Sequence, residues 1–345
     1  MTIRLGVLEG DGIGPEIVPE ARRVIEATGL DAEFVDLPFG WDGYEAHGST
    51  VPEVTLDALA DCDGWLLGPI LAGEYPEDDP AGPSPSGTVR TAFDLYANVR
   101  PVRSFAGVGP EGFDLTIFRQ NTEGFYADRN MHVGDGRVMP TEDVAVSMRV
   151  VTREESRRIA EDAFAYADAR GKDVTVVHKA NVLTHGDGLF LEECEAVAAD
   201  YPDVDVETSL VDAFAMELVV DPTGHEVVLT TNLYGDILSD EAAGVVGSLG
   251  LAPSLNHGAD HGMAQAAHGA APDIAGEGVA NPAAMILSGA MLLEWLGDRG
   301  AADAAAAADA IDEAVGATLD AGVRTPDLGG DATTASFTDA VIDRL

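Results

Sequence analysis

The chain has 345 residues, 46% of them hydrophobic, which suffices for one large domain or two closely joined domains with a sizeable core. Its 61 acidic and 19 basic residues give a formal net charge of −42, which argues against nucleic-acid binding because phosphate contacts need basic patches. We expect a cytoplasmic protein, since no apolar run is long enough to cross a membrane, the N-terminus lacks a secretory signal, and Cys62 and Cys194 match no disulfide or metal motif.

The excess of acid also predicts the environment of the protein. Acidic residues are spread along periodic segments, so a polyacidic interaction tail is the poorer interpretation. We expect a folded protein adapted to high salt, where ions screen the repulsion among its own charges. Lysine is almost absent, since only Lys172 and Lys179 occur, and this scarcity makes each of the two informative.

Strands and helices alternate along the chain, which predicts an α/β protein with substantial parallel sheet. Ile3–Leu8 is predicted as a buried strand, followed by a glycine-rich turn and a helix that begins near Pro15. Further strands are expected at 64–68, 115–118, 144–151, 174–178 and 227–231. Further helices are expected at 153–170, 188–200, 237–247, 282–296 and 301–321.

Two segments are predicted to be irregular. The stretch 75–87 is rich in Pro, Gly, Asp and Ser, which favours a loop, and its position just before Arg90 suggests that it faces a substrate. The stretch 128–143 lacks helical periodicity and contains Gly-Asp-Gly, so we expect a hairpin or a protruding arm there.

The first motif is GDGIG at 10–14, between the first strand and the first helix. Such a turn can bring backbone N–H groups to an anionic ligand at a helix N-terminus. It does not match GxGxxG, and a purely structural tight turn is an equally good interpretation.

Four arginines form the second pattern: Arg90, Arg100, Arg103 and Arg119 fall close together in a chain that is otherwise poor in basic residues. Arginine binds carboxylates through two parallel hydrogen bonds, so three converging arginines suit a di- or tricarboxylate substrate. Ion pairing with the many surface acids is the alternative.

Lys179 follows the apolar strand 174–178 in the segment HKANVL. Partial burial lowers the pKa of a lysine and makes it usable as a base. A solvated lysine is the usual alternative, but in this chain the surface has nearly lost that residue type, so we expect a chemical role.

The sharpest pattern is TTNLYGDILSD at 230–240, which places Asp236 and Asp240 four residues apart. On a helix both carboxylates project from one face and repel each other unless a cation lies between them. Oxygen ligands without His or Cys favour Mg²⁺ or Mn²⁺ over zinc. Two solvated acids in an acid-rich chain are the alternative.

The last motif, HGAAPDIAG at 268–276, is a glycine- and proline-containing loop that carries His268 and Asp273 and continues to Asn281. We expect it to hold a nucleotide, with Asp273 accepting hydrogen bonds from ribose hydroxyls. An acid there would repel a 2′-phosphate and so favours NAD over NADP. In isolation the segment is a turn before a helix.

Together these segments resemble one family, the metal-dependent β-decarboxylating dehydrogenases, which act on isopropylmalate, isocitrate, homoisocitrate and tartrate or D-malate. The resemblance runs from LEGDGIGP at 8–15 to TPDLGG at 325–330 and includes DLYANVRP and RQNTEGFYA. It implies an open α/β fold of two domains, with mixed sheets flanked by helices and no Rossmann motif. A cofactor-side domain would combine 1–95 with 248–345, and 96–247 would form a middle domain with the dimer interface and the arm.

The resemblance also implies how substrate and metal are bound. Arg90, Arg100 and Arg119 are similar to the residues that clamp the substrate carboxylates. Mg²⁺ or Mn²⁺ would be bound by Asp236 and Asp240, together with Asp212 of the partner subunit. The shared site makes a homodimer the minimum functional unit, and dimers could pair further into a tetramer.

Catalytic and cofactor roles follow from the same resemblance. Lys179 would help to deprotonate the 2-hydroxyl group as hydride leaves for NAD, and Tyr126 would protonate the carbon that loses CO₂. Contacts to NAD are implied for Asn181 beside the nicotinamide and for the adenosine-binding residues His268, Gly269, Asp273 and Asn281.

The loop before Arg90 departs from isopropylmalate enzymes, which carry apolar residues there for the branched alkyl group. Here Ser84 and Ser86 make it polar and partly similar to isocitrate enzymes. A buried hydroxyl left unpaired would cost roughly 1–3 kcal/mol. The leading expectation is nevertheless 3-isopropylmalate, the leucine-biosynthesis substrate, because NAD-dependent members of this size most often use it; isocitrate, homoisocitrate and tartrate or D-malate are the alternatives.

Two further departures concern glutamines. Gln120 stands where a Glu usually follows the clamp arginine, and Gln265 opens a QAA segment that replaces an EPV-like one. They put close equivalence with any one family member in doubt. A paralogue that binds a carboxylate or nucleotide without catalysis is the alternative of a different class, and turnover would exclude it.

Overall fold

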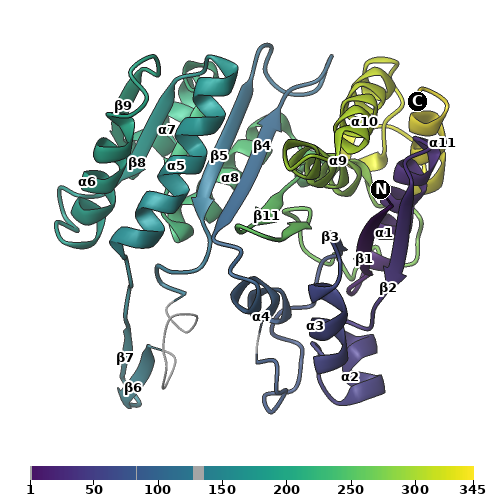
Figure 1. Cartoon of the computed structure of the whole chain (residues 1–345), viewed down its shortest axis with the longest axis horizontal. Coiled ribbons are helices and arrows are strands. Elements are labelled where there is room, and N and C mark those ends of the chain that lie inside the picture. Colours follow the sequence, from purple (N-terminus) through teal and green to yellow (C-terminus); the bar gives the residue numbers. More distant parts are fainter. Residues whose placement is uncertain (1, 83, 127–135) are drawn as a thin grey trace. The chain divides into compact units, whose positions relative to one another are not determined.

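The computed structural model describes residues 2–82, 84–126 and 136–345. It divides into two compact units, each built from segments that are separate in sequence. The first unit comprises Met1–Phe93, Ser104–Glu111 and Val246–Leu345, and the second comprises Asp94–Arg103 and Gly112–Val245. Helices and strands alternate through most of both units, which confirms the predicted α/β class (Figure 1).

The sheet of the first unit has the strand order β2-β1-β3-β12-β11. Its strands are β1 (Ile3–Leu8), β2 (Ala32–Asp36), β3 (Gly64–Leu67), β11 (Leu255–His257) and β12 (Gly262–Ala264). All neighbours are parallel except β11 and β12. Seven helices accompany them: α1 (Gly14–Ala27), α2 (Trp41–His47), α3 (Glu53–Ala60), α4 (Pro85–Ala92), α9 (Ala283–Asp298), α10 (Ala302–Asp320) and α11 (Thr334–Ile342).

Helix α9 is the centre of the hydrophobic core of this unit. Twelve of its sixteen residues are buried, because the sequence is apolar on nearly every side. It packs against α1, α10 and β12.

The second unit has the strand order β4-β5-β10-β8-β9. Its strands are β4 (Ala97–Arg103), β5 (Asp114–Gln120), β8 (Val174–His178), β9 (Val206–Leu210) and β10 (Val227–Thr230), and only β4 and β5 are antiparallel. Helices α5 (Arg153–Arg170) and α6 (Gly186–Ala198) lie in front of the strands in Figure 1, and α7 (Val211–Val220) and α8 (Asn232–Val246) lie behind them. Every residue of β8 and β10 is buried, as expected for strands covered on both faces.

A two-stranded antiparallel hairpin, β6 (Arg137–Thr141) and β7 (Val144–Ser147), interrupts the second unit. All nine strand residues are exposed, including Val138, Met139 and Val146. The prediction of a hairpin is confirmed for this part of 128–143, and residues 128–135 lie outside the described residues.

Some predicted boundaries are wrong. The loop expected at 75–87 ends early, because Pro85–Gly87 form the first turn of α4. Ser84 caps that helix by accepting a hydrogen bond from the backbone N–H of Gly87 (3.3 Å), and Pro85 suits its first position. Helix α8 begins at Asn232, five residues before the predicted start, and β7 ends at Ser147 instead of 151.

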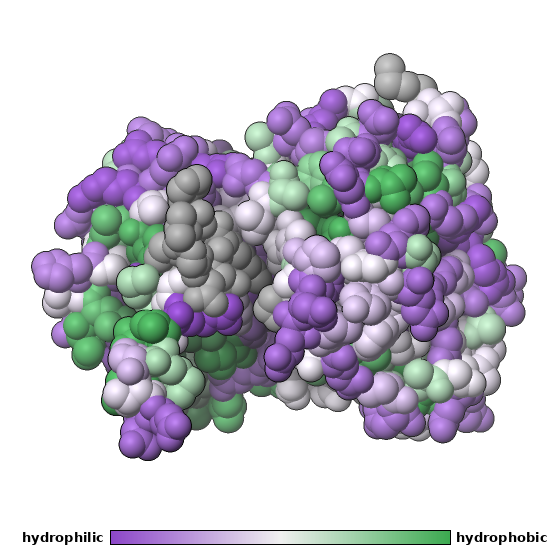
Figure 2. Space-filling view, turned by 90° about the horizontal axis from the view of Figure 1, so that it is seen from below, coloured by the Kyte–Doolittle hydropathy of each residue, from purple (hydrophilic) through white to green (hydrophobic). Residues whose placement is uncertain are grey.

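The surface is largely hydrophilic on the face shown in Figure 2, with smaller hydrophobic areas between. Helices α7 and α8 expose several apolar side chains, namely Met216, Val219, Val220 and Ile237. Within the part of the chain that the structure describes, no helix is both long and apolar enough to cross a membrane.

Candidate active site

Asp236 and Asp240 lie one turn apart on α8, as predicted. Nη1 of Arg100 is 3.4 Å from an oxygen of Asp236 and 3.8 Å from one of Asp240, so the two carboxylates share one face of the helix. Their side chains are 38% and 55% exposed. Burial raises the pKa of Asp240, and the charge of Asp236 acts in the same direction against the opposing Arg100.

Arg100 and Arg119 bring two buried guanidinium groups to these carboxylates from β4 and β5. Arg119 hydrogen-bonds Asp236 through Nη1 and donates Nε–H and Nη2–H to Oδ1 of Asn232 (2.9 and 2.7 Å). Arg100 donates to the hydroxyl of Ser239 (2.6 Å). Burial and the neighbouring charge of Arg119 lower the pKa of Arg100 to about 10, which still leaves Arg100 positive at neutral pH.

Tyr126 completes this cluster in the second unit. Its hydroxyl donates to Oδ2 of Asp236 (3.1 Å), and its ring centroid lies 5.9 Å from the guanidinium carbon of Arg119. A proton donor, two arginines and two carboxylates thus meet where the middle of β4 and the end of β5 face the first half of α8. Sequence analysis predicted all five residues, but it missed Asn232, the fully buried residue that fixes Arg119.

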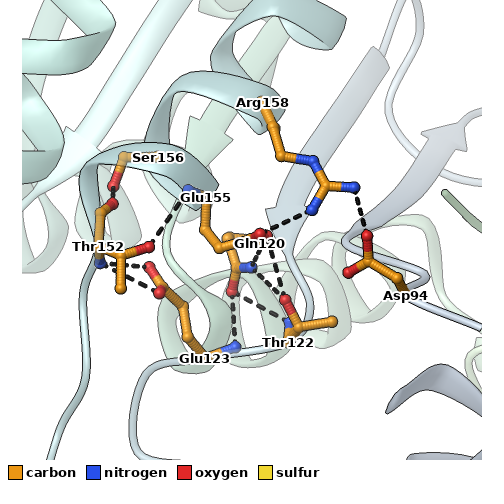
Figure 3. A network of polar contacts seen from close by, with 8 residues as sticks. All are labelled: Asp94, Gln120, Thr122, Glu123, Thr152, Glu155, Ser156 and Arg158. Atoms are coloured by element: carbon orange, nitrogen blue, oxygen red, sulfur yellow. Dashed lines mark hydrogen bonds and ion pairs between the residues drawn. The ribbon is translucent and has the colours of Figure 1, made fainter. Parts of the chain in front are cut away.

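The turn between Arg119 and Tyr126 is tied to the N-terminus of α5 (Figure 3). Glu123 is buried, and both of its carboxyl oxygens accept the backbone N–H of Thr152 (3.0 and 3.1 Å), the residue that caps α5. Burial raises the pKa of Glu123 to about 7, although the hydrogen bonds from Thr152 act against it. The turn is therefore held by a buried acid that titrates near neutrality.

Lys179 follows β8, where it was predicted, and its ammonium group hydrogen-bonds Asp212 in the first turn of α7. This contact lowers the pKa of Asp212. Among the described residues no three His, Cys, Asp or Glu side chains gather as a metal site, so Asp212 does not join Asp236 and Asp240 within one chain.

A buried ion pair lies beneath Lys179, and sequence analysis missed it. Asp187, fully buried in the first turn of α6, accepts the backbone N–H of Lys179 (2.6 Å) and pairs with Arg149. Arg149 also donates to the hydroxyl of Thr231 (3.0 Å), and its guanidinium carbon lies 5.4 Å from the ring centroid of Tyr234. The pair thus connects the lysine segment with the start of α8.

In the first unit the GDGIG turn and the HGAAPDIAG loop lie against each other. Ile13 donates its backbone N–H to the carbonyl of Ala270 (2.9 Å). Gly12 has φ +58°, and a Cβ there would lie 2.0 Å from that carbonyl oxygen, so only glycine fits. Glu16 accepts backbone N–H groups of Gly276 and Gly278, the latter at 2.9 Å. The GDGIG turn therefore packs against the HGAAPDIAG loop, the candidate nucleotide-binding loop, and fixes its position.

The predicted cofactor residues of this loop differ in their surroundings. His268 donates Nδ1–H to the carbonyl of Gly269 (3.0 Å), which leaves Nε2 as an acceptor. That atom is buried and has no hydrogen-bond partner in the described structure, and burial lowers the pKa of the ring. Asp273 is exposed. Asn281 is buried, and its side chain bonds Asp327 (3.1 Å).

Of the substrate-loop candidates, Ser84 caps α4 and Ser86 is buried in its first turn. Arg90, in the last turn of α4, donates from Nη2 to Oε1 of Gln265 (2.7 Å). Arg90 and Gln265 belong to the first unit, whereas Arg100 and Arg119 belong to the second. Asn181 is exposed in the turn after β8.

Comparison with known proteins gives a consistent result over the whole chain. Residues 4–341 match the family model described as isocitrate/isopropylmalate dehydrogenase. The isocitrate/homoisocitrate dehydrogenase of Thermus thermophilus is 46% identical, with 100% of this chain and 99% of that protein covered. A 3-isopropylmalate/3-methylmalate dehydrogenase of Methanocaldococcus jannaschii is 41% identical, with 99% and 98% covered.

A solved structure agrees with the sequences. The isocitrate dehydrogenase from Methylococcus capsulatus superposes with a TM-score of 0.87 at 41% identity, and 99% of each chain is covered. The fold class predicted from the sequence is confirmed. The chain belongs to the isocitrate/isopropylmalate dehydrogenase family and is a β-decarboxylating dehydrogenase.

Proposed function

We propose that this enzyme uses NAD to oxidise the 2-hydroxyl group of a 3-substituted malate and then releases the carboxylate on C3 as CO₂. The observation that carries the proposal is the cluster of Arg100, Arg119, Tyr126 and the acid pair of α8. Two buried guanidinium groups supply the charge and the paired donors that substrate carboxylates need. Tyr126, whose hydroxyl donates to Asp236 at 3.1 Å, lies beside these guanidinium groups and can serve as a proton donor.

Each chemical step has a residue suited to it. Arg100 and Arg119 hold the carboxylates and orient the C2–C3 bond, which is a positioning contribution. The ammonium of Lys179 first gives a proton to the carboxylate of Asp212, its hydrogen-bond partner, and the neutral amine then accepts the proton of the 2-hydroxyl. Tyr126 then donates its hydroxyl proton to C3 once CO₂ has left.

The acid pair fits a divalent metal in donor chemistry, because carboxylate oxygens are the ligands that Mg²⁺ and Mn²⁺ prefer. Asp236 and Asp240 would hold the ion from one chain, and a second copy would add its Asp212. An ion held there would supply Lewis-acid stabilisation for the negative charge that develops on the oxygen of C2.

The nucleotide-loop candidate fits NAD. The buried, unpaired Nε2 of His268 is an acceptor suited to an exocyclic amino group such as that of adenine. Asp273, exposed on the same loop, suits ribose hydroxyls and repels a 2′-phosphate. NAD bound at this loop would supply the acceptor for the hydride on C2.

We also propose a homodimer with shared active sites. Lys179 and Asp212 bond each other away from the acid pair of their own chain, which is the arrangement expected if they serve the site of a second copy. The apolar side chains exposed on α7 and α8 are the surface on which that copy would pack.

The structure of α4 favours a polar substituent on C3, as in isocitrate or homoisocitrate. Its one large aliphatic side chain, Val89, is fully buried in the core and leaves none on that helix for an isopropyl group. Ser86, one turn before Arg90, is buried and carries a hydroxyl in place of an alkyl group. The 46% identical relative, named as an isocitrate/homoisocitrate dehydrogenase, adds support. 3-Isopropylmalate is the second candidate, favoured by the relative with 41% identity.

The test is NADH formation in molar KCl with Mn²⁺ or Mg²⁺, with isocitrate, homoisocitrate, 3-isopropylmalate, D-malate and tartrate offered in parallel. We expect the highest kcat/KM with one of the two tricarboxylates. Preference for 3-isopropylmalate would reverse the order of the two candidates. No turnover of any acid would refute the catalytic proposal and favour a binding protein.

A further inference from the structure

Gln120, the last residue of β5, makes an unusual number of contacts for one side chain (Figure 3). It is 2% exposed. Its Oε1 accepts the backbone N–H groups of Thr122 (3.2 Å) and Glu123 (3.0 Å). Its Nε2 donates to the hydroxyl of Thr122 (2.8 Å) and to a carboxyl oxygen of Glu155 (3.2 Å).

Only an amide can make both sets of bonds. A carboxylate accepts hydrogen bonds but cannot donate them, so a glutamate here would lose the bond to Glu155. It would keep a bond to the hydroxyl of Thr122 only if that hydroxyl turned away from Glu155, to which it now donates (3.2 Å). It would also place a second negative charge at hydrogen-bond distance from Glu155. Buried Glu123 lies on the same turn, and the charge of Glu155 already helps to raise the pKa of Glu123.

Glu155 cannot easily turn away from such a charge. It lies in the first turn of α5, where an acid is favoured by the helix dipole. Nη1 of Arg158 donates to one of its oxygens (2.7 Å), and Nη2 of the same arginine donates to Asp94 (2.6 Å). The carboxyl group that faces Gln120 is therefore fixed from the other side.

The turn that Gln120 holds connects Arg119, which is proposed to bind the substrate, with Tyr126, the proposed proton donor. The carbonyl of Glu123 accepts Nδ2–H of Asn232 (2.9 Å), and Asn232 in turn fixes Arg119. Three residues beyond Glu123, Tyr126 bonds Asp236. A shift of the turn would displace both the clamp arginine and the proton donor.

We infer that Gln120 is a positioning residue, whose side-chain amide sets Tyr126 and Arg119 and whose identity as an amide is required by the carboxylate of Glu155. The inference rests on the proposed function, since it assigns Tyr126 and Arg119 their roles. The composition is in accord with it: in a chain with 61 acids, Gln occurs at two positions only, 120 and 265, and the second contacts Arg90.

The test is a double-mutant cycle in the full enzyme, with Gln120→Glu, Glu155→Gln and the two combined. Glu154→Gln is the matched control, because it removes the same charge from the same turn of α5 at an exposed position. The readouts are kcat, the KM values for substrate and NAD, and solvent-deuterium incorporation at C3 of the 2-oxo acid product, which needs Tyr126 but no hydride transfer.

For Gln120→Glu we expect kcat and deuterium exchange to fall about tenfold at pH 8 with the KM for NAD unchanged. The deficit relative to wild type should shrink as the pH is lowered, because a protonated carboxyl regains a donor. Gln120→Glu combined with Glu155→Gln should recover to within about twofold of Glu155→Gln alone, since donor and acceptor have changed places.

Wild-type kcat in Gln120→Glu would overturn the inference. So would a loss that Glu155→Gln does not repair or that Glu154→Gln repairs equally well, because the carboxylate of Glu155 would then not be the cause. If the wild-type enzyme turns over none of the acids, the proposed function itself is refuted. If the wild-type enzyme is active and the Gln120→Glu variant is equally active, only the inference about Gln120 is refuted.

Discussion

Replacement of Asp187 by Asn should lower both the stability and the turnover of the enzyme. Asp187 is fully buried, accepts the backbone N–H of Lys179 at 2.6 Å and neutralises Arg149. Asn keeps the shape and can still accept one hydrogen bond. It removes the charge, however, and leaves a guanidinium group that is 11% exposed without its carboxylate.

The size of the effect follows from these contacts. Removal of one partner from a buried ion pair costs about 3–5 kcal/mol, and the hydroxyl of Thr231 and the ring of Tyr234 still face Arg149, so the lower end, about 3 kcal/mol, applies. A chain of 345 residues has an unfolding entropy of about 0.7 kcal/mol per kelvin. The loss of about 3 kcal/mol divided by this entropy gives a fall in Tm of about 4 °C. We expect kcat to fall about tenfold, because Lys179 loses part of its backbone support.

Calorimetry in molar KCl and steady-state NADH formation measure the two effects. Asp200→Asn is the matched control, since it removes an exposed acid just beyond the same helix, α6. A Tm for Asp187→Asn within about 1 °C of the control would refute the reasoning. So small a change would mean that the loss of the Asp187 carboxylate does not leave Arg149 as an uncompensated buried charge.

Four further predictions concern the metal, pH, salt and assembly. Asp240→Asn should raise the Mn²⁺ concentration for half-maximal activity at least about tenfold in a metal titration, and an unchanged requirement would exclude Asp240 as a ligand. Burial raises the pKa of Glu123 from 4.5 to about 7, so the folded state holds a proton that the unfolded state releases, and the free energy of unfolding falls as the pH rises between these values. Glu123→Gln should remove that fall, up to about 1.4 kcal/mol per pH unit, in denaturant unfolding; an unaltered pH dependence would contradict it. Dialysis into dilute buffer should lower the Tm or dissociate the proposed dimer, and an unchanged Tm and sedimentation coefficient would contradict the adaptation to high salt. Lys179→Met and Asp236→Asn, each inactive alone, should recover about a quarter of wild-type activity when refolded together, because mixed dimers contain one intact site; no recovery would place both residues in the site of one chain.

The fold class and most of the individual candidate site residues could be proposed from the sequence because each of them rests on a local pattern. The spacing of Asp236 and Asp240 fixes a common helix face, and Lys179 at the end of an apolar run fixes a strand end. The family resemblance added the roles. These signals lie within a few residues of one another, so no tertiary contact is needed to read them.

The supporting residues could not be predicted because their partners are far away in sequence. Asn232 and Arg119 are 113 positions apart, and Arg149 and Asp187 are 38 apart. Nothing near Asn232 or Asp187 distinguishes them from ordinary helix-start residues. Helix α4 as a whole was missed for a different reason: Ser84 and Pro85 are helix-start signals, but they are embedded in a run of loop-forming residues.

The β6–β7 hairpin has a consequence for how the enzyme is made. Its nine strand residues are exposed in the single chain, and an isolated two-stranded hairpin is at best marginally stable in water. In the proposed homodimer a partner copy would supply contacts outside the two strands, and folding and association would then become one concentration-dependent event. In a two-fold interface every substitution occurs twice and can meet itself. If the hairpin lies in that proposed interface, its sequence must be compatible with its own copy, and one substitution there would change the interface at two places.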